Sequence, residues 1–180
     1  GGICVGLSVS TVASYISSYI ETILGSAGIY ISMPQIETPS DPAAFAIYVI
    51  LMTVAPALIE ELTFRGIVMQ SLRRFGDIFA LVTSALLFGI FHMNLMQMPY
   101  AFLLGLAMGY FVMRTGSLWV SIGIHFLNNL VSVVLDVCYG VMTYKNFVML
   151  NLTWSLLTLA LGGLALALML MRHQDIFRFE

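Results

Sequence analysis

The chain has little charge and few cysteines, and each shortage excludes a class of protein. Charged residues make up 9% of its 180 residues, against about 25% in a soluble domain. Seven lysines and arginines are too few for the basic patch that holds nucleic acid, so we expect no nucleic-acid partner. Cys4 and Cys138 belong to no Cys-x-x-Cys pair, so we expect small apolar residues and neither a disulfide nor a metal site.

Most residues of the chain are apolar. They form 60% of the chain, and its mean hydropathy is +0.98. A membrane span needs about 20 apolar residues, so the length suits one all-α, polytopic transmembrane bundle of about six helices. The chain opens Gly1-Gly2-Ile3, with neither a methionine nor a basic leader region, so we expect it to be part of a longer protein.

Apolar runs between helix breakers predict six helical segments. They cover about residues 3–24, 43–72, 77–94, 99–113, 117–137 and 147–171. We expect three units from this pattern. They are an N-terminal transmembrane helix with an extracytoplasmic loop (residues 1–42), a core (residues 43–138), and a C-terminal transmembrane helix with a basic cytoplasmic tail (residues 139–180).

Arginines follow alternate helices. Arg73 and Arg74 follow the second helix, Arg114 the fourth, and Arg172 and Arg178 the sixth, while the loops on the other side carry only Lys145. The positive-inside rule places the arginine-bearing ends in the cytoplasm. We therefore expect a multi-pass protein of the cell membrane with a cytoplasmic N-terminus, surrounded by membrane lipids.

Three motifs place polar side chains inside these apolar segments. They are Glu60-Glu61-x-x-x-Arg65, Phe88-x-x-x-His92 and His125-x-x-x-Asn129. Such groups are costly at bilayer depth unless they face the bundle interior or a wet cavity, which makes them candidates for a functional site. At about 1.5 Å per residue, Glu60, His92 and His125 lie about 20 Å, about 23 Å and about 12 Å from the cytoplasmic ends of their helices. The motifs can therefore meet at one level.

The two glutamates differ in their expected partners. Glu61 and Arg65 are four residues apart with the acid first, the favoured orientation for an ion pair within a helix. Glu60 points about 100° away around the helix. We expect Glu61 to be neutralised and Glu60 to be free. The alternative is a structural charge network of all three side chains.

The histidine motifs each place two groups on one helix face. His92 lies one turn after Phe88, and Asn129 lies one turn after His125. Asn94 is a candidate supporting partner for His92. A single histidine on an apolar face is more often structural, but both of these lie at the depth of Glu60. We therefore treat the histidines as candidate functional residues.

Two kinds of chemistry suit this set. A carboxylate can take a proton from water and return it to a leaving amine, while histidine or asparagine N–H groups stabilise the oxyanion. Alternatively, Glu60, His92 and His125 are three zinc ligands that leave the fourth position open. Spacing does not choose between these, because the three side chains come from different helices. The His-Glu-x-x-His and Gly-x-Ser-x-Gly motifs are both absent.

Other polar and aromatic residues receive structural interpretations. Asn128 is expected to point away from the Asn129 face. Tyr100 and Tyr144 lie near expected interfaces, which is typical of an aromatic belt. Asp77 and Asp136 lie at helix ends, which counts against a pair of catalytic aspartates.

Taken together and in this order, the motifs resemble those of the CAAX prenyl protease and bacteriocin-processing family, also called the Abi family, over about residues 43–138. Gly116-Ser117-Leu118-Trp119 is similar to the bacterial branch. The resemblance implies an all-helical intramembrane endopeptidase whose active site is reached from the cytoplasm. Its substrates would be peptides or lipidated peptides, and some bacterial members are tied to bacteriocin self-immunity.

The resemblance also implies roles for individual residues. Glu60 would be the base that activates water. His92, His125 and Asn129 would bind the oxyanion or a metal, and Glu61, Arg65, Phe88 and Asn94 would shape the site. The family is described both as glutamate-dependent and as metal-dependent. We favour a reaction that requires no cofactor, with zinc as the alternative.

Two other classes of function compete with a peptidase. One is a catalytically silent membrane protein that acts as an immunity factor or a scaffold. The other is a proton-coupled carrier in which Glu60 and the histidines form a relay. Such carriers usually show internal repeats and broken helices, whereas this chain shows no repeat, and Pro56 is its one candidate break.

Overall fold

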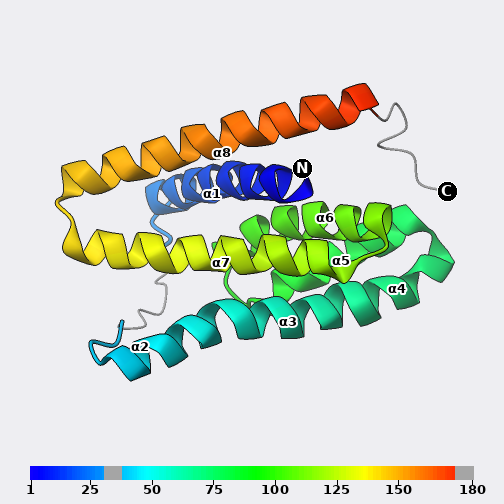
Figure 1. The fold of residues 1–180 in the computed structure, drawn as a ribbon, viewed down its shortest axis with the longest axis horizontal. Helices are drawn as coiled ribbons and strands as arrows, with labels where there is room; N and C mark the ends of the chain where they lie inside the picture. The colour runs from blue at the N-terminus through cyan, green and yellow to red at the C-terminus, as the bar shows by residue number, and fades with distance from the viewer. Residues whose placement is uncertain (31–37, 173–180) are drawn as a thin grey trace.

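The computed structural model describes residues 1–30 and 38–172, which form helices and no strands. The predicted all-α fold is confirmed. Six helical segments follow one another: α1 (Gly2–Ser26), a long segment containing α2 (Pro42–Val49), α3 (Ala55–Glu61) and α4 (Met69–Leu72), then α5 (Asp77–Phe91), α6 (Gln97–Thr115), α7 (Leu118–Val141) and α8 (Tyr144–Arg172) (Figure 1). Much of the expected N-terminal loop and the basic tail with Arg178 lie outside the described residues.

Four described helices are long and apolar enough to cross a membrane. They are Gly2–Ser26, Pro42–Phe75, Leu118–Val141 and Tyr144–Arg172. The apolar helix α5 is shorter, with 15 residues. Large apolar side chains such as Ile59 and Leu156 are exposed on the outside of the bundle, as lipid-facing residues are. The chain is therefore a multi-pass membrane protein.

Helix α5 ends at Phe91, whereas the sequence predicts a helix to residue 94. The predicted end is wrong because Met93 adopts a φ of 48°, in the left-handed region that ends a right-handed helix. The Asn94 side-chain oxygen then accepts the N–H of Met96 at 2.9 Å. Asn94 thus shapes the turn that leads into α6.

The long segment Pro42–Phe75 contains two π-helical stretches, η1 (Ile50–Val54) and η2 (Leu62–Val68). They flank α3, which carries both glutamates at its C-terminal end. Pro56 accounts for the first stretch, because proline offers no N–H to the preceding turn and its ring needs room there. Isolated π-helical turns recur at functional sites, and here they bracket the Glu-Glu motif.

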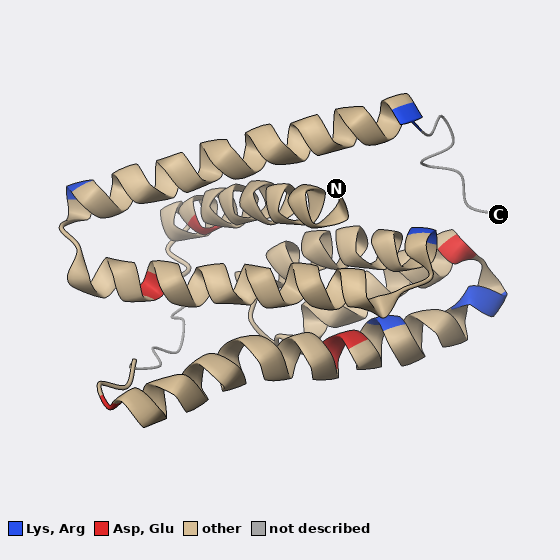
Figure 2. Cartoon of the chain, in the orientation of Figure 1, with Lys and Arg blue, Asp and Glu red and all other residues tan. Residues whose placement is uncertain are grey.

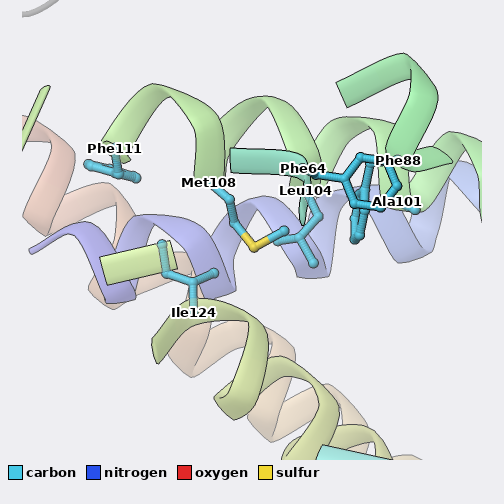
Figure 3. Packing of buried hydrophobic residues seen from close by; sticks show 7 residues of the cluster. All are labelled: Phe64, Phe88, Ala101, Leu104, Met108, Phe111 and Ile124. Atoms are coloured by element: carbon cyan, nitrogen blue, oxygen red, sulfur yellow. The ribbon is translucent and has the colours of Figure 1, made fainter. Parts of the chain in front are cut away.

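The apolar core lies where α5, α6 and α7 meet the long segment. Its buried members are Phe64, Phe88, Ala101, Leu104, Met108, Phe111 and Ile124 (Figure 3). Gly105 lets α6 approach closely, because a Cβ on it would lie 2.9 Å from Arg65 Nη2 and 3.2 Å from Ala85. The buried side chain of Arg65 therefore packs directly against α6 at Gly105.

The arginine-bearing helix ends lie together. Figure 2 shows the ends of the long segment, α6 and α8, which carry Arg73, Arg114 and Arg172, at one end of the bundle. The start of α2 and the turn between α7 and α8 lie at the opposite end (Figure 1). The arginines thus mark one end of the bundle, and its assignment to the cytoplasm stays a prediction.

Candidate active site

Glu61 is fully buried and binds two other motif residues. Arg65 Nη1 donates to Glu61 Oε1 at 2.8 Å, so the expected ion pair is confirmed. His125 Nδ1, from α7, donates to the same oxygen at 2.9 Å. Arg65 is also fully buried, and a buried ion pair that loses one partner is strongly destabilised. Glu61 therefore joins α3 to α7 and does not face the pocket as a free base.

Phe88 lies between the charged pair and the histidines. The Arg65 guanidinium carbon is 4.2 Å from the centre of the Phe88 ring, a cation–π contact. The rings of His92 and His125 meet Phe88 edge-on, with centroids 4.9 Å and 5.8 Å away. The three motifs are thus one packed unit in which Phe88 orients both imidazoles.

Both histidines use Nδ1 to donate to a fixed acceptor. His92 Nδ1 lies 2.9 Å from the Phe88 carbonyl oxygen, which can only accept. His125 Nδ1 donates to the Glu61 carboxylate. In the neutral imidazole, Nε2 then carries a lone pair. Each histidine can therefore donate from Nε2 to an oxyanion only when it is protonated, which the sequence did not show.

Glu60 differs from Glu61 in both exposure and partners. Its side chain is 20% exposed, against 0% for Glu61. Glu60 Oε2 is 3.8 Å from His125 Nε2 and accepts no hydrogen bond from any residue that the structure describes. This oxygen is itself buried, and Glu61 Oε2 also lacks a partner, so the exposed fraction of the side chain is what separates the two glutamates. Glu60 is therefore the accessible carboxylate of the pair.

A pocket of about 730 Å³ lies between α7 and the long segment, and the side chains of the three motifs contribute to its lining. The long segment contributes Tyr48, Met52, Pro56 and Glu60, α7 contributes His125, Asn128, Asn129, Ser132, Val133 and Asp136, and the region from α5 to α6 contributes His92, Gln97 and Tyr100. The four residues expected to be catalytic thus line one pocket.

The pocket extends in one direction from Glu60. Tyr48 lies three turns before Glu60, near the start of the long segment, and Asp136 lies near the C-terminal end of α7. Both of these ends point away from the arginine-bearing ends (Figures 1 and 2). If the arginines face the cytoplasm, the pocket extends away from it. The predicted cytoplasmic entrance therefore gains no support from the direction of the pocket.

The roles of Asn128 and Tyr100 were misread from the sequence, and that of Ser10, which does not line the pocket, was missed. Asn128 is buried and lines the pocket, so the expectation that it points away is wrong. Its Oδ1 accepts from the hydroxyls of Ser10 and Tyr100, and its Nδ2 donates to Asn129 Oδ1 at 3.2 Å. Tyr100 is thus tied inside the bundle and is not a belt residue. No local pattern relates Ser10, on α1, to these partners.

The side chains of the alternative zinc site do not form a cluster. Among the residues that the structure describes, no three histidine, cysteine, aspartate or glutamate side chains are grouped so as to hold a metal ion. Glu60 and His125 approach each other, but His92 does not complete a ligand set with them. As placed here, the three side chains do not fit a zinc ion.

One family matches the chain over residues 42–131, half of its length: type II CAAX prenyl endopeptidase Rce1-like. The matched range contains all three motifs, from Glu60 to Asn129. No curated protein and no solved structure matches the chain. Members of the matched family are membrane peptidases. The chain belongs to the Rce1-like family of type II CAAX prenyl endopeptidases.

Proposed function

We propose that the chain is an intramembrane endopeptidase in which Glu60 activates the attacking water. The observation that supports this most directly is the exposure of the Glu60 side chain, which lines the pocket and is 20% exposed, whereas Glu61 is fully buried. Glu60 removes a proton from the water as its oxygen attacks the scissile carbonyl carbon. The same carboxyl then gives the proton to the leaving amine as the C–N bond breaks.

Asn129 and the histidines stabilise the intermediate in this proposal. Asn129 accepts from Asn128 through Oδ1, which leaves its side-chain NH₂ to donate to the oxyanion. His125 Nε2 lies beside Glu60 and, once protonated, is a second donor. Glu61 and Arg65 act indirectly, because they hold His125 in place.

The proposed reaction requires no cofactor, and a zinc site made of Glu60, His92 and His125 is the competing mechanism. It predicts about one zinc per chain in the purified protein and loss of that zinc in His92→Ala. Elemental analysis of both proteins decides between the two mechanisms. Removal of metal by a chelator, followed by a cleavage assay, gives a second and independent readout.

We also propose that the substrate is a peptide or lipidated peptide, including precursors of the bacteriocin-processing type, and that the arginine-bearing ends face the cytoplasm. A role in self-immunity would follow from cleavage of such a peptide. If a cellular immunity phenotype survives in Glu60→Gln, the catalytically silent scaffold explains it better.

The test uses the purified protein in detergent and a library of peptides with and without a lipid. Wild type is expected to cleave a subset of the library, and Glu60→Gln is expected to cleave the same peptides at least about 100-fold more slowly. Glu21→Gln is the matched control, because Glu21 is an exposed acid on α1 outside this pocket. Equal cleavage by wild type and Glu60→Gln would refute the role of Glu60.

A further inference from the structure

One face of α7 lines the pocket, and Asp136 is the last residue of this face. Asn129, Ser132, Val133 and Asp136 all line the pocket and recur every three or four residues, which places them on one face of the helix. At 1.5 Å per residue, Asp136 lies about 10 Å beyond Asn129 and about 16 Å beyond His125 along the helix axis. The Asp136 carboxylate therefore lies at the end of the pocket farthest from the reacting groups.

The permanently charged side chains along the pocket are acidic. Among the described residues that line it, Glu60 and Asp136 are acidic and none is lysine or arginine. Arg65 does not line the pocket, because it is fully buried against Glu61. Asp136 is exposed and forms no ion pair with any residue in the described ranges. A group that binds beside Asp136 would thus meet a negative charge that is not already held in an ion pair.

Because Asp136 lines the same pocket as the reacting groups, we propose that Asp136 selects peptides with a lysine or arginine side chain three to five residues from the cleaved bond. This rests on the proposed peptidase function. An extended peptide rises about 3.3 Å per residue, so the distances of about 10 Å and about 16 Å correspond to three and five residues. A free C-terminal carboxylate at the same place would be repelled.

The size of the preference follows from the exposure of Asp136. Exposed ion pairs contribute modestly, so a lysine at the right position should raise kcat/KM about two- to fivefold over glutamine. Because such pairs are screened by salt, the preference should shrink as ionic strength rises. A preference that is based on shape alone would not respond to salt.

The experiment measures kcat/KM for a series of fluorogenic peptides in which one lysine moves along a glutamine-containing reference. Wild type should prefer lysine at one position three to five residues from the cleaved bond. In Asp136→Asn the lysine-to-glutamine ratio at that position should fall to about one, and in Asp136→Lys a glutamate peptide should become the better substrate. The exposed acid Glu21, outside this pocket, provides the control Glu21→Gln, which should keep the wild-type ratio.

The role of Asp136 would be overturned if the lysine preference persists in Asp136→Asn. It would also be overturned if wild type cleaves the glutamine peptide but shows no preference for lysine. Either result would leave the peptidase function standing. Loss of all cleavage in wild type would instead refute the peptidase function. Binding of the same peptides to Glu60→Gln, followed by fluorescence anisotropy, tests the preference without turnover. Equal affinity for the lysine and glutamine peptides there would also overturn it.

Discussion

His125 Nδ1 lies 2.9 Å from Glu61 Oε1, although the two residues are 64 positions apart in the chain. The same carboxylate oxygen also accepts from Arg65. Glu61 thus has a buried structural partner on its own helix and another on α7. This contact separates the roles of the paired glutamates, because it leaves only Glu60 open to the pocket.

Glu61→Gln should destabilise the protein far more than Glu60→Gln. Removal of the Glu61 charge leaves Arg65 buried and unpaired, which costs about 3–5 kcal/mol. Glu60 has no ion pair of this kind, so its replacement should change the free energy of unfolding by less than about 1 kcal/mol. Thermal unfolding in detergent measures both variants, and equal losses of stability would contradict the assignment.

Tyr100→Phe should lower kcat about fivefold and leave KM nearly unchanged. The variant removes a hydroxyl that holds Asn128, which in turn holds Asn129, and one such hydrogen bond is worth about 1 kcal/mol. Ser10→Ala should act in the same direction, and the double variant should lose less than the sum of the two effects. Tyr144→Phe is the control, because Tyr144 is exposed. Additive losses would show that the hydroxyls do not act through Asn128.

Gly105→Leu should lower the free energy of unfolding by about 1–3 kcal/mol or more, because overpacking forces neighbouring atoms apart. A Cβ at this position already lies 2.9 Å from Arg65 Nη2. Gly163→Leu is the matched control on another helix, where a Cβ meets no atom within 4 Å. Chemical denaturation in mixed micelles compares the two variants. If both are equally stable, the close approach of α6 to Arg65 is wrong.

The orientation can be tested with single cysteines in a Cys4→Ser, Cys138→Ser background. Phe75 and Tyr144 are exposed and lie near opposite ends of the bundle. If the arginine-bearing end is cytoplasmic, a membrane-impermeant thiol reagent should label Tyr144→Cys in intact cells and Phe75→Cys only after lysis. The reverse pattern would contradict the positive-inside assignment and would place the end of the pocket that contains Tyr48 and Asp136 on the cytoplasmic side.

The parts of this site that are local in sequence could be predicted. The Glu61–Arg65 pair spans one helical turn, so its spacing was enough to predict it. The shared pocket followed from helix depths and a constant rise per residue.

The contacts that could not be predicted from the sequence depend on how the helices rotate and pack against each other. The contact between His125 and Glu61 joins two helices whose relative rotation no motif records. The hydrogen bonds of Asn128 to Ser10 and Tyr100 link three helices, and none of these three residues is a defining position of a motif. The early end of α5 depends on the positive φ of Met93, an uncommon conformation for a residue with a side chain.

The central claim is that Glu60 activates water for peptide hydrolysis, and the single-turnover rate constant of one defined peptide tests it most directly. General-base catalysis contributes about 10²–10⁴-fold, so Glu60→Gln should cleave at least about 100-fold more slowly than wild type while it still binds the peptide. In ¹⁸O-labelled water, the wild-type product should carry one labelled oxygen in its new carboxyl group. A Glu60→Gln protein that cleaves at the wild-type rate would contradict the account.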